Sequence, residues 1–357
     1  MALAQSNGLL DAQLELYRNA TAMIKSMALK SALDLRIANA IDHHGGAATL
    51  AQVAAELTLH PSKIPCMRRL MRTLAVCGVF TVQHSAVSAA DEPVYTLTPL
   101  SRLLVGSSNL VPITSMLLHP AFVSPLLEIG KWFQNELPPD QCSIFKQKHG
   151  ESIWERAGHD TAFDALFNDA MFSDSNFIMD IAIKEHGEVF KGISSLVDVA
   201  GGLGGAAQAI SKAFPEIKCS VLDLGHVVSK APSGTLVEYV AGDMFEAIPS
   251  ANAIFLKYVL HDWSHEKCVE ILKNCRKAIP SRDDGGKVII IDIVVGAGTS
   301  DQKKRELQAL FDICLMFVSN GIEREEQKWN KVFLEAGFSS YKIIPDLGYM
   351  SIIEVYP

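Results

Sequence analysis

The chain lacks the features of a membrane, secreted or nucleic-acid-binding protein. In 357 residues no run approaches the roughly 18 consecutive apolar residues that cross a bilayer. The N-terminus has no basic segment leading into an apolar one, so we predict no secretory signal. Its net charge is −8, whereas nucleic acids and anionic membranes attract cationic faces. We therefore predict a soluble, cytoplasmic protein that binds neither nucleic acid nor membrane.

Cysteine pairs at metal-ligand or redox spacing are also missing. The seven cysteines are odd in number and scattered, and no Cys-x-x-Cys pair occurs among them. This pattern argues against a disulfide framework and a zinc site, and it is typical of reduced thiols in a cytosolic protein. The sequence also has no internal repeat and no low-complexity segment. Its length predicts two globular domains.

The N-terminal half is predominantly helical. Apolar residues recur at helical spacing over residues 12–40, Thr49 precedes a helix as an N-cap, and a further helix over about 62–77 ends at Gly78. Two short strand-like runs, VFTVQ and VYTL, follow. Helices followed by a two-stranded wing are the outline of a winged helix. We predict such a domain over residues 1–115.

A winged helix raises the alternative of a non-catalytic, DNA-binding protein. The helix at 62–77 carries Arg68, Arg69 and Arg72, which supports this alternative. However, residues 1–110 contain 9 Lys and Arg against 7 Asp and Glu, a small excess for a DNA-binding domain. The 12–40 helix is apolar on more than one face, which favours burial against a second copy. We therefore predict a homodimer.

The C-terminal half has the pattern of an α/β domain. A helical connector over 106–180 is interrupted by prolines (Pro112, Pro120, Pro125, Pro138 and Pro139). From about residue 194, short β-branched runs alternate with amphipathic helices, which predicts a parallel sheet with crossover helices. The runs SYKIIPDLG and YMSIIEVYP predict a terminal hairpin that adds a reversed strand. We assign residues 116–357 to this second domain.

A glycine-rich loop identifies a nucleotide-like site. The strand LVDVA runs directly into Gly201-Gly202-Leu203-Gly204-Gly205, where the backbone can turn sharply and a ligand can approach closely. Asp223 follows Gly201 by 22 residues, at the end of the next strand, and can accept both ribose hydroxyls of an adenosine. Gly202, Gly204 and Ala207 match a dinucleotide pattern. Both NAD and S-adenosylmethionine fit these residues.

Three features favour S-adenosylmethionine. The carboxylate of Asp198, just before the loop, can hold an ammonium group and would repel a pyrophosphate. Asp243 can bind the adenine amine while Met244 packs on the ring. The reversed terminal strand is unusual for a dehydrogenase. Ordinary capping of a strand end would also explain Asp223 and Asp243. An NAD-dependent oxidoreductase therefore stays as the alternative.

The sequence resembles the plant small-molecule O-methyltransferases of the isoflavone, flavonoid and caffeate type. The motifs that carry the resemblance span the chain: LVDVAGGLGG, KCSVLDLGHVV, AGDMFEAIP, LKYVLHDWSHEKCVEILKNC, GGKVIIIDIVV, NGIEREEQKW and SIIEVYP. It implies an N-terminal dimerisation domain on a winged-helix plan, followed by a Rossmann-like class I methyltransferase domain. It also implies an acceptor that is a small aromatic molecule with a hydroxyl group.

The resemblance also implies residue roles. It places Ser175, Gly201, Asp223, Asp243, Met244 and Lys257 around S-adenosylmethionine, His261 as catalytic base between Asp292 and Glu323, and Phe163, Phe167, Met171 and Asn320 in the acceptor pocket. Two positions depart from the family. Ala200 replaces the first of three consecutive glycines, which is tolerated if its φ is negative, and Tyr258 stands where many relatives carry Trp.

These residues suit methyl transfer to a phenol. An unprotonated imidazole at His261 can remove the phenolic proton, and an acidic neighbour can fix its tautomer. The sulfonium is already an activated donor, so we predict no metal. The structural alternatives are a turn histidine at His261 and core packing for the Phe and Met residues of 163–171; we assign Asp262 no role beyond helix capping. Flavonoids, stilbenes, alkylresorcinols, hydroxyindoles and hydroxycinnamates all stay open as acceptors.

Overall fold

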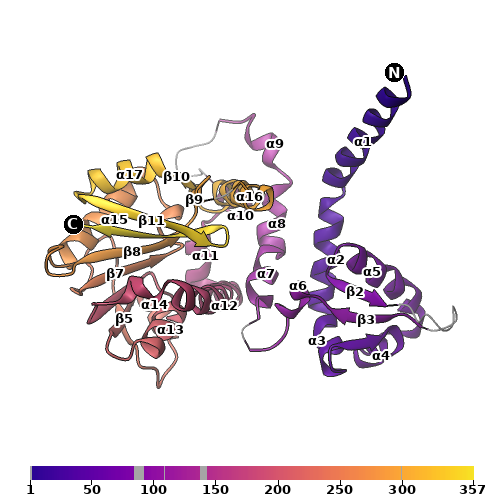
Figure 1. Ribbon diagram of the computed structural model, residues 1–357, viewed down its shortest axis with the longest axis horizontal. Helices are drawn as coiled ribbons and strands as arrows, with labels where there is room; N and C mark the ends of the chain where they lie inside the picture. The colour runs from indigo at the N-terminus through magenta and orange to yellow at the C-terminus, as the bar shows by residue number, and fades with distance from the viewer. Residues whose placement is uncertain (1, 84–91, 108, 137–142, 299) are drawn as a thin grey trace. The chain divides into compact units, whose positions relative to one another are not determined.

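The structure is a computed structural model that describes residues 2–83, 92–107, 109–136, 143–298 and 300–357 (Figure 1). The chain divides into two compact units, residues 1–118 and 119–357. The boundary expected after residue 115 falls inside the last helix of the first unit, α7 (Val111–Leu117). Within the described ranges, no helix is long and apolar enough to cross a membrane.

The first unit is a helical domain with a small sheet. In chain order it contains α1 (Ala2–Ala20), α2 (Ala22–Asp34), α3 (Ile37–His43), β1 (Ala47–Thr49), α4 (Leu50–Glu56), the 3₁₀ turn η1 (Pro61–Lys63), α5 (Ile64–Val76), β2 (Phe80–Gln83), β3 (Val94–Leu97), α6 (Pro99–Arg102) and α7. Strand β3 pairs antiparallel with β2 and with β1, so the expected wing is present and has a third strand. The described hydrophobic core of this unit includes Ile37, Ile41 and Met71.

The prediction of one helix over residues 12–40 is wrong. Helix α1 ends before Thr21, and α2 ends before Leu35 and Arg36. Arg36 has a left-handed φ of 55°, which a continuing right-handed helix cannot accommodate. The cap expected at Thr49 is confirmed, because its side chain accepts from the Gln52 amide in a capping box.

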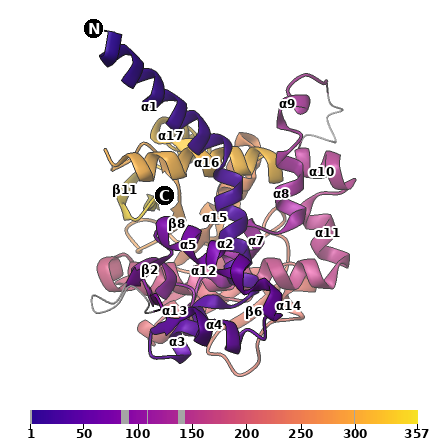
Figure 2. The same ribbon diagram turned by 90° about the vertical axis from the view of Figure 1, so that its right-hand side faces the viewer.

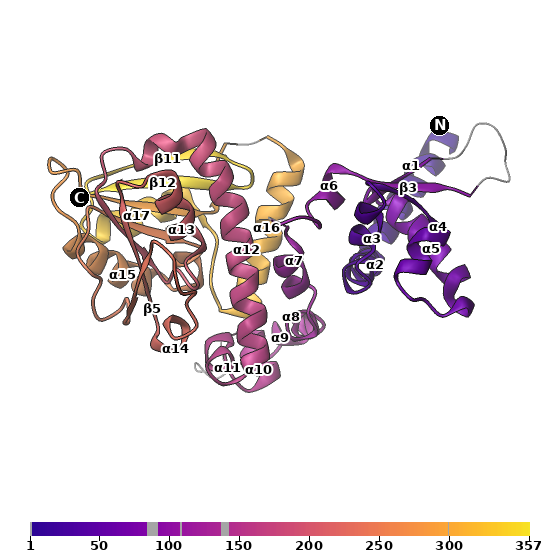
Figure 3. The same ribbon diagram turned by 90° about the horizontal axis from the view of Figure 1, so that it is seen from below.

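The second unit begins with the helical connector. Its helices are α8 (Pro120–Leu126), α9 (Ile129–Trp132), α10 (Ile144–His149), α11 (Ile153–His159), the long α12 (Thr161–His186) and the 3₁₀ turn η3 (Gly187–Phe190). Figure 2 shows α8 and α10 side by side, and Figure 3 shows α11 at the start of α12. Pro112 and Pro120 start helices instead of breaking them, because a first-turn proline costs no hydrogen bond. Pro125 lies inside α8, and Pro138 and Pro139 fall outside the described residues.

A seven-stranded sheet forms the centre of the second unit. The remaining elements are β4 (Ser195–Val199), α13 (Gly205–Ala213), β5 (Lys218–Asp223), α14 (Gly225–Val228), β6 (Glu238–Ala241), β7 (Ala253–Lys257), the 3₁₀ turn η4 (Leu260–Asp262), α15 (His265–Ala278), β8 (Lys287–Asp292), β9 (Val294–Val295), α16 (Gln302–Val318), β10 (Arg324–Glu325), α17 (Glu326–Glu335), β11 (Ser340–Leu347) and β12 (Met350–Tyr356). The strand order is β11-β12-β8-β7-β4-β5-β6. Strands β4 to β8 are parallel, and β12 runs antiparallel to β8. The predicted parallel sheet with a reversed strand in a terminal hairpin is confirmed.

Helices cover both faces of this sheet (Figure 1). One buried cluster joins the sheet to α15 and α17, and a second joins it to α12 and α13. The central strands are buried on both faces, as in β8, where every residue is buried. The sheet therefore gives a rigid base, and its carboxyl ends present the loops that follow β4, β5, β7 and β8.

Candidate active site

His261 lies in the short η4 turn that follows β7 (Ala253–Lys257). The next helix, α15, is capped by Ser264, whose hydroxyl accepts from the Lys267 amide. The expected capping role of Asp262 is therefore taken by Ser264, and Asp262 faces the histidine instead, with Oδ2 3.8 Å from Nε2 of His261. His261 is 7% exposed, so its protonation depends on its protein neighbours.

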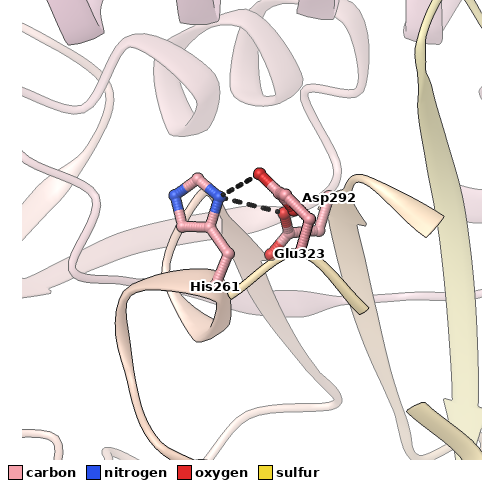
Figure 4. Close-up of side chains that lie close together, drawn as sticks. All are labelled: His261, Asp292 and Glu323. Atoms are coloured by element: carbon pink, nitrogen blue, oxygen red, sulfur yellow. Dashed lines mark hydrogen bonds and ion pairs between the residues drawn. The ribbon is translucent and has the colours of Figure 1, made fainter. Parts of the chain in front are cut away.

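Two buried carboxylates face the Nδ1 atom of His261 (Figure 4). Oε1 of Glu323 lies 3.1 Å from Nδ1 and forms a hydrogen bond with it. Oδ1 of Asp292, at the end of β8, lies 3.3 Å from the same nitrogen. A proton on Nδ1 would therefore be donated to a carboxylate, which leaves the lone pair on Nε2. In Figure 4 this second nitrogen points away from both carboxylates.

The acidic neighbours change the protonation of the whole cluster. Burial by itself lowers the pKa of His261, but the charges of Asp292, Asp262 and Glu323 outweigh burial and raise that pKa to about 10. Burial in turn raises the pKa of Glu323 to about 7, opposed by its hydrogen bond with His261. It also raises the pKa of Asp292. The cluster therefore holds protons more tightly than the same groups would in water.

The loop before Glu323 packs directly on the histidine backbone. The Ile322 amide donates to the His261 carbonyl at 2.8 Å. A Cβ at Gly321 would lie 2.2 Å from that carbonyl oxygen, so only glycine permits the approach. Asn320 stands one residue earlier with a left-handed φ of 61°, and its side chain is exposed. The turn thus sets the distance between Glu323 and His261.

The same three side chains have the composition of a metal site. Ligand atoms of His261, Asp292 and Glu323 all lie within 4.8 Å of one another. One oxygen of each carboxylate, Oδ2 of Asp292 and Oε2 of Glu323, is buried without a hydrogen-bond partner in the described part of the chain. The arrangement could hold a divalent cation, a water molecule or a proton. Metal independence therefore stays a prediction for experiment.

The glycine loop lies over Asp198, the residue in strand β4 just before it. A Cβ at Gly201 would come within 2.6 Å of the Asp198 carboxylate, so the loop needs glycine there. Asp198 is 2% exposed, and its Oδ2 atom has no partner among the described residues. Burial raises the pKa of Asp198 to about 7, opposed by a hydrogen bond from the Ala207 amide. This carboxyl group thus lies beneath the loop with one polar atom unsatisfied.

Asp223 ends β5 beside the same loop. Its Oδ2 accepts from the Gly202 amide at 2.8 Å and its Oδ1 from the Leu224 amide at 2.7 Å. Each oxygen keeps a lone pair for a ligand hydroxyl. The condition set for Ala200 is not met, because its φ is +53°. This position belongs to the left-handed region, which strains an alanine and explains a preference for glycine.

The remaining residues expected around the cofactor occupy three nearby elements. Asp243 follows β6 and accepts from the Phe245 amide at 2.9 Å, and Met244 packs partly buried against the sheet core. Lys257, at the end of β7, forms a buried ion pair with Asp174 of helix α12. Ser175, the next residue of α12, lies against Gly205 at the start of α13. Helix α12 is therefore fixed across both the loop and the end of β7.

Comparison with known proteins decides the family. An O-methyltransferase domain model matches residues 127–339, and an O-methyltransferase dimerisation domain model matches residues 17–107. The chain is 61% identical to O-methyltransferase ZRP4 of Zea mays, over 98% of this chain and 97% of the relative. It is 51% identical to the 5-pentadecatrienyl resorcinol O-methyltransferase of Sorghum bicolor, over 99% and 98%. The chain belongs to the O-methyltransferase family.

The fold agrees with that membership. CalO1, a methyltransferase in calicheamicin biosynthesis solved with SAH bound, superposes with a TM-score of 0.78 at 24% identity, over 98% of this chain and 99% of the other. The prediction of an S-adenosylmethionine-dependent O-methyltransferase is confirmed, as is the resemblance on which it rested. An oxidoreductase and a non-catalytic protein are thereby excluded as the chain's class.

The expected acceptor residues of the methyltransferase lie in different surroundings. Phe163 is 3% exposed and stacks on Phe122 with ring centroids 5.7 Å apart, so the core-packing alternative describes it. Phe167 is partly exposed and packs edge-on against Trp154 at 5.6 Å. Met171, one turn further along α12, is also partly exposed. Acceptor contacts by these side chains and by Asn320 stay predictions.

The sequence did not predict the role of Tyr258 beside His261, nor that of Tyr349, which contacts Tyr258. The ring of Tyr258 stacks on the imidazole with centroids 4.9 Å apart and planes within 7°. The Tyr258 hydroxyl lies 2.6 Å from the Tyr349 hydroxyl, in the turn of the terminal hairpin. Tyr258 was noticed only as a departure from Trp. Its left-handed φ of 54°, which brings it to this position, has no signal in a single sequence.

Proposed function

We propose that this methyltransferase transfers the methyl group of S-adenosylmethionine to a hydroxyl of a small phenol, with His261 as general base. The observation that carries the proposal is the orientation of the imidazole: Nδ1 faces Glu323 and Asp292 at 3.1 and 3.3 Å, which leaves Nε2 for the acceptor. Only a base with one nitrogen so held presents a defined lone pair.

The basicity of the cluster suits a phenol. A phenolic hydroxyl has a pKa of about 10, and the neighbouring carboxylates raise the pKa of His261 to a similar value. Proton transfer from the acceptor to Nε2 is then nearly balanced in energy, whereas an ordinary imidazole would accept that proton uphill. Because of this high pKa, only a small fraction of His261 is unprotonated at neutral pH. Turnover should therefore increase as the pH rises above the usual histidine range.

The residues of the glycine loop fit an adenosine-bearing sulfonium. Asp223 has free lone pairs on both oxygens beside the loop, and the unsatisfied oxygen of buried Asp198 can accept from an ammonium group or a bridging water. We propose that Asp243, Met244, Ser175 and Lys257 complete this site; Lys257 would act together with Asp174. When bound, S-adenosylmethionine supplies an electrophilic methyl group, and the protein holds the acceptor oxygen in line.

We propose a phenol with an extended apolar substituent as the first acceptor to test, because a relative at 51% identity is named for a pentadecatrienyl resorcinol. A panel with labelled donor should contain an alkylresorcinol, a stilbene, a flavonoid, a hydroxycinnamate and a hydroxyindole. Preference for the alkylresorcinol by kcat/KM would support this choice. Preference for the hydroxyindole would show that the acceptor is not an alkylresorcinol, although the reaction would still be methyl transfer to a hydroxyl.

We propose that the protein is a homodimer through its N-terminal unit. This unit contains the matched dimerisation domain, and helices α1 and α2 expose large apolar side chains (Leu9, Leu10, Leu14, Leu16, Tyr17, Met23 and Ile24). A two-fold partner would cover such a surface. Light scattering should give twice the mass of the chain. A monomer mass across micromolar concentrations would refute the proposal.

The decisive test of the base is His261→Ala. Turnover should fall by about 10²–10⁴, the usual contribution of a general base, while calorimetric binding of S-adenosylmethionine stays unchanged. His265→Ala is the matched control, because His265 lies four residues away at the start of α15, where it is half-buried and pairs with Glu335. Near-normal turnover by His261→Ala at neutral pH would show that positioning alone drives the reaction.

A further inference from the structure

The turn that carries His261 is held by hydrogen bonds to its main-chain carbonyls. Two of these bonds come from one side chain: Nη1 of Arg324 donates to the Leu260 carbonyl at 2.9 Å, and Nη2 donates to the Trp263 carbonyl at 2.6 Å. These carbonyls lie on either side of His261 in the chain. The guanidinium therefore spans the residues that bracket the base.

Arg324 is an unusual residue in this position. It is 2% exposed, and the hydrogen bonds recorded for its guanidinium all go to carbonyl oxygens, including a longer one to Ile322. None of the ion pairs among the described residues includes Arg324. Its Cζ also lies 5.4 Å from the ring centroid of the fully buried Trp329. A buried charge is costly, so its retention without a paired carboxylate calls for a specific use.

The turn that Arg324 binds carries a histidine surrounded by acidic groups. Asp262 on the same turn, Asp292 at the end of β8 and Glu323 next to Arg324 all raise the pKa of the histidine, and Tyr258 stacks on its ring. Arg324 is always charged, and its field lowers the pKa of Asp292, against the larger effect of burial. Its permanent positive charge therefore acts on Asp292, whose Oδ1 lies 3.3 Å from Nδ1 of His261.

We propose that Arg324 is a positioning residue for the reaction: its planar guanidinium binds the Leu260 and Trp263 carbonyls at once and so fixes the turn that presents His261. This inference rests on His261 being the base. Arg324 touches neither donor nor acceptor in this scheme. Lysine keeps the positive charge but lacks the two-pronged fork, so Arg324→Lys tests the fork separately from the charge.

The experiment compares Arg324→Gln and Arg324→Lys in the full-length protein. ¹⁵N-histidine labelling with bound S-adenosylhomocysteine reports the hydrogen bond at Nδ1 of His261, and the signal is assigned by its loss in His261→Ala. In both variants this signal should shift, because the turn no longer holds Nδ1 at one distance from Glu323. Both should lower kcat by about 10–10²-fold while the affinity for S-adenosylmethionine stays within about twofold, since small misplacements of a base are costly.

Arg276→Gln is the matched control, because Arg276 donates to the Gly337 carbonyl at 2.6 Å on the exposed side of α15. It should change neither the His261 signal nor kcat. The inference is overturned if both Arg324 variants lose activity only in proportion to unfolded protein, with the His261 signal unmoved. It is equally overturned if Arg324→Gln keeps wild-type kcat. Should His261→Ala stay active, the base assignment fails, and the labelled-histidine spectrum still shows whether Arg324 positions His261.

Discussion

Replacing Glu323 by glutamine should shift the pH dependence of turnover toward lower pH. The substitution keeps an oxygen that can accept from Nδ1 of His261 but removes a charge 3.1 Å from that nitrogen. An opposite charge at such a distance shifts a pKa by about one to three units. The loss of Glu323 therefore lowers the pKa of His261 from about 10 by about that amount.

The shift has two opposed effects on the rate. With a pKa of about 10, only about one molecule in 10³ has a neutral His261 at pH 7, so the wild-type rate rises with pH over a wide range. In Glu323→Gln the neutral fraction at pH 7 grows, and the acid limb of kcat/KM moves down by about one to three pH units. The plateau above the limb falls, because a less basic imidazole accepts the phenolic proton less readily.

The assay is the initial rate of methyl transfer from labelled donor between about pH 6 and pH 10, with the donor saturating and the acceptor varied. Glu325→Gln is the control, because Glu325 is exposed two residues away and should leave the profile unchanged. An acid limb that stays in place, or moves upward, in Glu323→Gln would refute the role of this carboxylate in setting the basicity of His261.

Three further perturbations test the cofactor site and the metal. Asp223→Ala should weaken S-adenosylmethionine binding by about 1.5–3 kcal/mol, and unchanged calorimetric affinity would contradict its assignment. Ala200→Gly should stabilise the fold by about 0.5–1 kcal/mol, because the relief of a strained left-handed alanine outweighs the entropy that glycine adds to the unfolded chain. A lower Tm would contradict that strain. The control is Ala253→Gly in β7, which should destabilise the fold. A chelator should leave turnover intact, whereas loss in EDTA that magnesium restores would assign a metal to the His261 cluster.

Features that are local in the chain could be predicted from the sequence. The strand, glycine loop and helix at residues 195–213 form one continuous pattern, and so does the terminal hairpin. The spacing from Gly201 to Asp223 reflects one helix crossing back to the neighbouring strand. Predictions from local sequence were wrong where a single backbone dihedral decided the structure, as at Arg36 and Ala200, because no neighbouring residue indicates a positive φ.

The partners of His261 could not be obtained from spacing. Glu323 lies 62 residues away in sequence, and Tyr258 reaches a hydroxyl 91 residues away. Asp292 and Glu323 were assigned through the family resemblance, whereas Arg324 and Tyr349 carried no expectation at all. Such contacts depend on how the ends of β7 and β8 and the start of β10 come together, which a single sequence does not specify.

The strained residues near His261 show how these long-range contacts act together. Tyr258 and Asn320 both have left-handed φ angles, at a cost on the order of 1–3 kcal/mol for such a residue. Tyr258 keeps its conformation because its hydroxyl is bound to Tyr349 and its ring stacks on the imidazole. Asn320 directs the chain into Gly321, which reaches the His261 carbonyl only because it has no Cβ. Both strained positions therefore lead into contacts with the same histidine, one with its ring and one with its backbone carbonyl, and a fixed imidazole is what the proposed role of His261 as base requires.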